Sequence, residues 1–147
     1  MWFDESVFYQ IYPLGYCGAE KYNDGGEVRR RLYKIEENIP ALRSLGFNAV
    51  LLNPLFESGW HGYDTVDFYR VDRRLGENAD FRSLVGKFHE AGMRVVLDGV
   101  FNHVGRGFFA FDEVRKHRER SDKKDWFHID FNGNTQYNDG FWYEGWE

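Results

Sequence analysis

The chain has 147 residues, enough for one domain with a hydrophobic core. Its formal net charge of −5 provides no basic patch of the kind that binds nucleic acid, so we expect no nucleic-acid partner. A single cysteine, Cys17, excludes an internal disulfide, and no apolar run approaches the roughly 18 residues of a membrane span. Because the N-terminal residues also lack a signal-peptide pattern, we expect a cytoplasmic protein with no membrane partner.

The first half of the chain predicts two strands with helical structure between them. Residues 7–12 (VFYQIY) are β-branched and aromatic and end at Pro13, which predicts a strand, and polar residues 18–26 predict a loop. Apolar residues then recur at helical spacing, at Leu32, Ile35, Ile39, Leu42 and Leu45. Pro40 predicts a kink or a helix that restarts there, and Gly46 fits the position just after a helix. Residues 49–52 (AVLL) predict a buried strand.

The next part of the chain predicts a long loop, a helix and a third strand. Residues 55–76 are rich in aromatic and carboxylate side chains, and loops of this length inside compact domains tend to be functional. One apolar helix face follows, formed by Phe81, Leu84, Val85 and Phe88. Asn78 or Asp80 is expected to cap this helix, and Gly92 to end it. Residues 94–97 (RVVL) predict a third buried strand.

This order of strands and helices is typical of a parallel α/β fold with crossover connections. The pattern changes after residue 103. Mixed charges at 112–124 predict a solvated helix, and the aromatic, Gly- and Asn-rich residues 125–147 predict no closing strand.

Polar or aromatic residues follow all three predicted strands. Tyr12 follows the first, Asn53 the second, and the run 98–103 (DGVFNH) the third. Because the carboxyl ends of parallel strands share one edge of a sheet, these residues are expected to converge there. Taken alone, each candidate also has a structural explanation. Asp98 could bond loop amides or an arginine, while His103 and Tyr63 could be packing residues.

Four segments in this order resemble the α-amylase superfamily (glycoside hydrolase family 13): VFYQIYP, LGFNAVLLNP, HGYDTVDFYRVDRRLG and LDGVFNH. They lie between Val7 and His103, and the DWFHI that begins at Asp125 is similar to the start of an inserted small domain in several members. The resemblance implies an α/β fold, an incomplete (β/α)8 TIM barrel of which this chain carries the first three βα strands. It divides the chain into barrel residues 1–104 and the start of the inserted domain at 105–147.

The resemblance also implies roles for four residues. Tyr63 would stack on the sugar at the cleavage site, His103 would hydrogen-bond that sugar's primary hydroxyl, and Asp98 would organise the site. Asn102 matches a position that ligates calcium in many members and braces the loop in others. Calcium is therefore the one cofactor to test, although residues 14–26 lack a clear D-x-D-x-D calcium loop.

Two departures from the family pattern matter for function. Trp60 lies where α-glucosidase relatives often carry an aspartate, which favours an amylase-like cleft over a strict α-glucosidase pocket. A retaining glycosidase needs a nucleophile and an acid/base about 5 Å apart. None of the 24 Asp and Glu residues matches the positions at which the family places them. No catalytic residue is therefore assigned.

The leading hypothesis is the N-terminal segment of a retaining α-glucan-acting hydrolase, inactive alone, with an α-glucan or maltooligosaccharide as ligand. A second is a non-catalytic carbohydrate-binding half that self-associates or complements a C-terminal barrel fragment, because an open barrel would expose strand edges. A third is a small metal-dependent hydrolase that uses Asp98, Asn102 and His103. It is disfavoured, because no second carboxylate cluster accompanies them.

Overall fold

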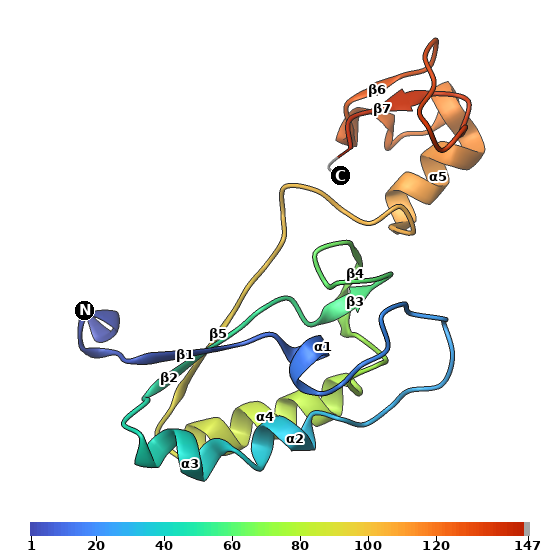
Figure 1. The fold of residues 1–147 in the computed structure, drawn as a ribbon. Helices are drawn as coiled ribbons and strands as arrows, with labels where there is room; N and C mark the ends of the chain where they lie inside the picture. The colour runs from blue at the N-terminus through green and yellow to red at the C-terminus, as the bar shows by residue number, and fades with distance from the viewer. Residues whose placement is uncertain (146–147) are drawn as a thin grey trace. The chain divides into compact units, whose positions relative to one another are not determined.

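The computed structural model describes residues 1–145 and divides into two compact units, Met1–Gly105 and Arg106–Glu147 (Figure 1). Each unit has its own hydrophobic core and is described separately. The predicted domain boundary lies one residue before the boundary between the units. Residues 146 and 147, which the prediction for 125–147 included, lie outside the described residues.

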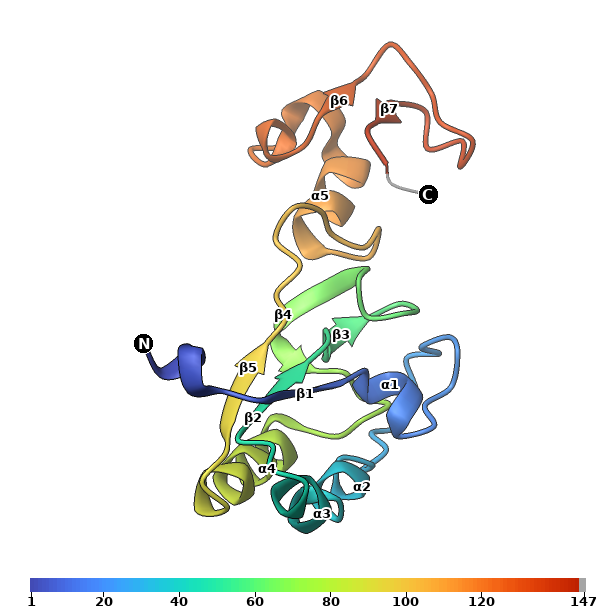
Figure 2. The same ribbon diagram turned by 60° about the vertical axis from the view of Figure 1, so that its left-hand side comes forward.

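The first unit is built on a parallel three-stranded sheet (Figure 2). Its strands are β1 (Phe8–Ile11), β2 (Ala49–Leu52) and β5 (Arg94–Leu97), in the order β1-β2-β5. All three pair in parallel and without a register shift. The three strands and the parallel α/β arrangement predicted from apolar runs are thus confirmed.

Helices connect the strands of this unit and contribute its core. After η1 (Trp2–Glu5) and β1 come α1 (Pro13–Tyr16), α2 (Tyr33–Glu36) and α3 (Ile39–Ser44), and α4 (Asn78–Glu90) precedes β5. Pro40 lies in the first turn of α3, so the helix restarts there rather than kinking. Gly46 follows α3 with a φ of +91°, as predicted for a residue that ends a helix. Ile35, Leu84 and Phe88 pack into the core with almost no exposed surface.

The predicted loop at 55–76 contains an antiparallel hairpin, so its assignment as irregular structure was wrong. Strands β3 (Phe56–Ser58) and β4 (Thr65–Val71) pair with irregular register. Thr65 and Val71 are buried, whereas the residues between them are half-buried or exposed. Asp67 and Arg70 interrupt the apolar pattern, which hides a strand made largely of β-branched and aromatic residues.

The N-terminus of α4 bears out one of the two predicted caps. Glu77 is the N-cap residue, and Asp80 completes a capping box, because its carboxylate accepts from the Glu77 backbone N–H at 2.8 Å. Asn78 does not cap, because its amide binds β4 instead. Its Oδ1 accepts from Val71 N–H at 2.9 Å, and its Nδ2 donates to the Tyr69 carbonyl at 2.8 Å.

Strand β5 is less buried than predicted. Its residues are half-buried or exposed, and the Leu97 side chain is 37% exposed. Among the described residues β5 pairs only with β2, so the other edge of the strand has no neighbour there.

The second unit consists of α5 (Phe109–His117), η2 (Arg118–Arg120), η3 (Lys124–Trp126), β6 (Ile129–Asp130) and β7 (Trp142–Tyr143). The charged stretch 112–124 is not one fully solvated helix, because α5 ends at His117 and buries Val114. The prediction that residues 125–147 contain no closing strand was wrong, because β6 and β7 pair antiparallel. Phe111 packs against Phe141 and Tyr143, so the Gly- and Asn-rich tail closes a small core.

None of the helices in residues 1–145 is long and apolar enough to cross a membrane.

A buried ion pair connects the hairpin to the loop after α1. Asp72 follows β4, is fully buried, and accepts from Arg74 Nε and Nη2 at 2.8 and 2.7 Å. It also accepts from the Ser58 N–H and hydroxyl. The same guanidinium donates through Nη1 to the carbonyls of Glu20 and Trp60, at 2.9 and 2.7 Å. The Arg74 side chain therefore joins β3, the residue after β4, the loop after α1 and the β3–β4 turn.

We predict that Arg74→Met strongly destabilises the first unit. Removing one partner of a buried pair leaves an uncompensated charge and costs about 3–5 kcal/mol. Urea unfolding followed by circular dichroism would measure this loss. Arg30→Met is the matched control, because Arg30 also pairs with two carboxylates, those of Glu77 and Asp80, but on an exposed side chain. Equal losses in the two variants would contradict the prediction.

Cys17 is a further buried ionisable group in this unit. Its side chain has no exposed surface. Burial raises the pKa of the Cys17 thiol to about 11, against the opposing charges of Lys34 and Arg31.

We predict a pH-dependent loss of stability that depends on this thiol. The unfolded thiol ionises near pH 8.5, so between about 8.5 and 11 only the unfolded state releases the proton. The free energy of unfolding should therefore fall by about 1–2 kcal/mol from about pH 8 to about pH 10. Urea unfolding of the wild type and of Cys17→Ala would measure it. The prediction fails if the two proteins lose the same amount over this interval.

Candidate functional site

The residues that follow the three parallel strands lie at one edge of the sheet, as predicted. Tyr12 follows β1, Asn53 follows β2 and Asp98 follows β5. Asn53 N–H donates to the Ile11 carbonyl, and Asp98 N–H donates to the Leu52 carbonyl, both at 2.9 Å. The backbone ladder thus extends past the strands and fixes the positions of these residues.

Asn53 links the strand ends to the β3–β4 turn. Its Oδ1 accepts from Gln10 Nε2 at 2.8 Å, and its Nδ2 donates to the Tyr63 hydroxyl at 2.5 Å. The Asn53 amide is thereby oriented by β1 and in turn orients the Tyr63 ring. Neither Gln10 nor this role of Asn53 was predicted, although Asn53 was expected at this edge.

Tyr63 and His103, two of the predicted site residues, are brought together. Tyr63 lies in the turn between β3 and β4, with 37% of its side chain exposed. Its N–H donates to His61 Nδ1 at 3.1 Å, and its carbonyl oxygen accepts from His103 Nε2 at 3.0 Å. Because a carbonyl only accepts, this contact requires a proton on Nε2 of His103.

The segment after β5 approaches the hairpin closely. Gly105 N–H donates to the Thr65 carbonyl at 2.7 Å. A Cβ atom on Gly105 would lie 2.3 Å from the carbonyl oxygen of Asp64, too close for any side chain. Glycine at this position therefore holds His103 beside the turn that carries Tyr63.

Tyr12 adds a phenol to this edge. Its hydroxyl donates to the His61 carbonyl at 3.1 Å, and the side chain is 41% exposed. Burial raises the pKa of Tyr12, while the Arg74 charge opposes that effect. Tyr12 is therefore a neutral hydrogen-bond donor at neutral pH.

Asp98 and Asn102 lie outside this hydrogen-bonded group. Asp98 is half-buried, Asn102 is exposed, and within residues 1–145 neither side chain makes a hydrogen bond or ion pair. The described part of the chain also contains no group of three or more His, Cys, Asp or Glu suited to hold a metal ion. Calcium also accepts Asn and backbone carbonyl oxygens, so the role of Asn102 as a calcium ligand stays a prediction.

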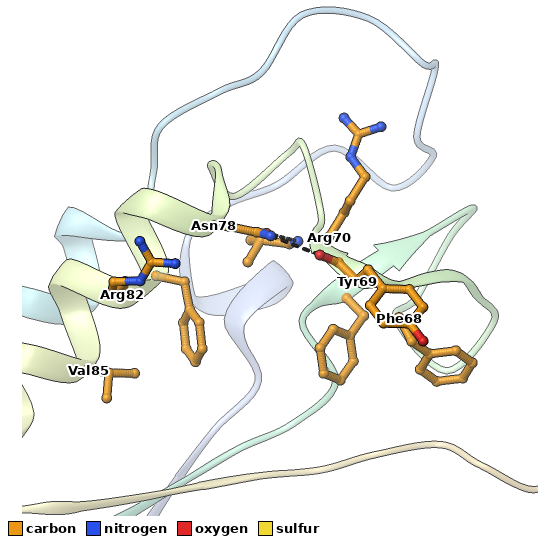
Figure 3. Close-up of a pocket in the computed structure, with 9 residues that line it drawn as sticks. Phe68, Tyr69, Arg70, Asn78, Arg82 and Val85 are labelled. Atoms are coloured by element: carbon orange, nitrogen blue, oxygen red, sulfur yellow. Dashed lines mark hydrogen bonds between the residues drawn. The ribbon is translucent and has the colours of Figure 1, made fainter.

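A separate groove of about 340 Å³ lies between β4 and α4 (Figure 3). Phe56, Phe81 and Val85 supply apolar walls, and Arg70 and Arg82 are further lining residues. None of the strand-end residues lines it, so this groove is distinct from the candidate site.

The fold and the site define a parallel α/β domain whose candidate site residues lie at the carboxyl ends of its strands. Residues 10–147 match the family model described as "Alpha amylase, catalytic domain". The chain therefore belongs to the α-amylase family.

Relatives and solved structures agree with this assignment. The chain is 37% identical to a cyclomaltodextrinase from Bacillus sp, over 87% of this chain and 26% of the relative. It is 34% identical to the intracellular maltogenic amylase of Bacillus subtilis, over 87% of this chain and 24% of the relative. Among solved structures, the Nostoc punctiforme debranching enzyme aligns with a TM-score of 0.80 at 34% identity, over 99% of this chain and 34% of that one. The chain thus spans about a quarter of the length of the curated relatives it matches.

We predict opposite effects of the same substitution at two glycines. Gly105→Ala forces a methyl group against the Asp64 carbonyl and should cost about 1–3 kcal/mol. Gly86→Ala, within α4 where the added Cβ meets nothing within 4 Å, should stabilise by about 0.5–1 kcal/mol. Thermal unfolding would compare them. A stable Gly105→Ala variant would contradict the close approach.

Proposed function

We propose that this chain forms the N-terminal part of a retaining α-glucan-acting glycoside hydrolase, and that its sheet supplies the first three strands of a (β/α)8 barrel. The match to the family model over residues 10–147 is the observation that carries this proposal. The parallel order β1-β2-β5, with a crossover between successive strands, supports it further. In the same proposal the second unit is the beginning of the domain inserted after the third barrel strand.

The sugar contacts belong to Tyr63, His103 and Asp98. In this proposal the exposed Tyr63 ring stacks on a glucose unit, His103 binds its primary hydroxyl, and Asp98 organises the edge of the site. The position of Tyr63 supports its role, because Asn53 holds the hydroxyl and His103 the backbone, leaving the ring face for a ligand. Asp98 lies at the end of β5, where it can bond a ligand or a neighbouring strand.

The substrate is a maltooligosaccharide or a related α-glucan. The names of the relatives support this choice, since they include cyclomaltodextrinases and maltogenic amylases. The intracellular location in one of these names also supports the cytoplasmic location expected for this protein.

The catalytic carboxylates would come from strands other than those described. Retaining hydrolysis needs a nucleophile and an acid/base about 5 Å apart. Asp98 is itself one of the proposed site residues and Asp64 follows Tyr63 in the sequence, and neither matches a catalytic position. The chain is therefore expected to bind sugar and not to cleave it.

A second candidate function is that of a non-catalytic half that pairs with another polypeptide. The open sheet favours it, because β1 and β5 each pair on one side only within residues 1–145. Phe8 on β1 and Leu97 on β5 are also 41% and 37% exposed. Unpaired edges of this kind bind further strands.

We predict that the 147-residue chain binds maltooligosaccharide through Tyr63 without releasing reducing sugar from maltodextrin. Tyr63→Ala should weaken binding about tenfold, because it removes the stacking ring and the acceptor of the Asn53 bond. Ligand-observed NMR titration and a reducing-sugar assay would measure the two properties.

Tyr33→Ala is the matched control, since Tyr33 is an exposed tyrosine on α2, 53% exposed. Reducing sugar released by the chain alone would refute the absence of a catalytic pair. Cleavage that appears only when a polypeptide with further barrel strands is added would favour the second candidate.

A further inference from the structure

The groove between β4 and α4 combines apolar walls with the size of a ligand site. Its volume of about 340 Å³ lies within the range of pockets that hold small organic ligands, about 300–1,000 Å³. Phe56, Phe68, Phe81 and Val85 line it, and all four side chains are half-buried. None of the lining residues in the described part of the chain is an Asp or a Glu. The groove therefore favours an apolar ligand body and offers no negative charge.

The rings in the walls indicate the shape of that body. The ring centroids of Phe56 and Phe68 lie 6.0 Å apart, and the ring planes meet at 62°. Rings in this edge-to-face arrangement present both an edge and a face to a further ring. A flat aromatic ligand can therefore extend the existing contacts between the walls.

The polar side chain in the groove is already used by the hairpin. Asn78 Oδ1 accepts from Val71 N–H at 2.9 Å, and Nδ2 donates to the Tyr69 carbonyl at 2.8 Å. Figure 3 shows both bonds between α4 and β4. The amide thus holds the two walls together, and the specific polar contacts for a ligand must come from charged side chains.

The charged side chains that line the groove are two arginines. Arg70 comes from β4 and Arg82 from α4, and both are exposed (Figure 3). Within the described part of the chain, neither guanidinium makes an ion pair or a hydrogen bond. The carboxylates of Glu77 and Asp80 at the start of α4 pair with Arg30 instead. Unpaired cations beside an apolar groove complement a ligand that carries a negative charge.

We propose that this groove binds a small aromatic carboxylate. The ligand ring lies between the phenylalanine side chains of the two walls, and its carboxylate pairs with Arg82. A planar guanidinium matches the two oxygens of a carboxylate, and Arg70 adds positive charge on the other wall. The proposal is independent of the proposed function, because none of the residues assigned to sugar contacts lines the groove.

The test compares 2-naphthoate with 2-naphthamide, which has the same ring system and no charge. Ligand-observed NMR titration of the full 147-residue chain would measure both affinities. The wild type should bind 2-naphthoate about twofold to fivefold more tightly, the range expected for an ion pair with an exposed arginine. In about 1 M NaCl this preference should disappear, because salt screens exposed charges.

Two variants separate the charge from the apolar walls. Arg82→Gln should remove most of the preference and leave the affinity for 2-naphthamide within about twofold of the wild type. Val85→Phe adds bulk to the half-buried wall and should weaken both probes about tenfold. Arg120→Gln is the matched control for charge, because Arg120 is exposed on η2 and also makes no ion pair within the described residues.

Each outcome decides for or against the groove as the binding site. A preference for 2-naphthoate that Arg82→Gln removes and Arg120→Gln preserves supports the proposal. Equal affinity for the two probes, no binding of 2-naphthoate, or the same loss in both arginine variants overturns it. Thermal unfolding would show whether Val85→Phe folds, and if it does not, the two exposed arginine variants still decide. Sugar binding through Tyr63 is measured separately, so neither proposal depends on the result for the other.

Discussion

The buried pair of Asp72 and Arg74 is the interaction on which the candidate site depends. Burial opposes the charge on Arg74, but the hydrogen bonds and charge of Asp72 outweigh it and raise the pKa of the guanidinium. Buried pairs of this kind contribute less to net stability than to a defined geometry, because desolvation offsets much of their attraction. In this protein the pair defines the geometry of the loop after α1 and of the β3–β4 turn, because Arg74 Nη1 donates to the carbonyls of Glu20 and Trp60.

The Asp72–Arg74 pair also influences the residues at the carboxyl ends of the strands. The hairpin turn that Arg74 holds also carries Tyr63, whose hydroxyl accepts from Asn53 and whose carbonyl accepts from His103. Asn53 thus positions the Tyr63 hydroxyl, His103 contacts the Tyr63 backbone carbonyl, and Arg74 holds the same turn through the Trp60 carbonyl. The Tyr63 ring is thereby held in one position, and a side chain held in this way loses less conformational entropy in any further contact.

The sequence predicts the sheet better than it predicts the site. Strands β1, β2 and β5 follow from continuous apolar runs, and the end of α3 follows from Gly46. The hairpin was missed because its strand alternates irregularly and carries Asp67 and Arg70. The Asp72–Arg74 pair could not be predicted either, because neighbouring charged residues normally indicate a solvated surface. Burial of such a pair depends on tertiary contacts with the loop at residue 20, which no local pattern contains.

The candidate site also depends on both sequence motifs and tertiary contacts. The resemblance to the α-amylase superfamily selects Tyr63 and His103, yet the contact between them depends on turn geometry. Gly62 adopts a φ of +92° and packs against the Pro54 carbonyl, and Gly105 passes against Asp64. Both close approaches exclude a side chain at positions 62 and 105, so glycine at each is required for this packing.

Binding and cleavage place different demands on this architecture. Stacking needs a ring held at one angle, and the hairpin, Asn53 and Arg74 meet that demand within the first unit. Cleavage needs two carboxylates about 5 Å apart across the bond, which requires strands that close around the ligand. The turn that carries Tyr63 is therefore ordered by contacts within the first unit. The position of the Tyr63 ring thus depends on the hairpin and on the residues that hold it, whereas a carboxylate pair at that spacing depends on further barrel strands.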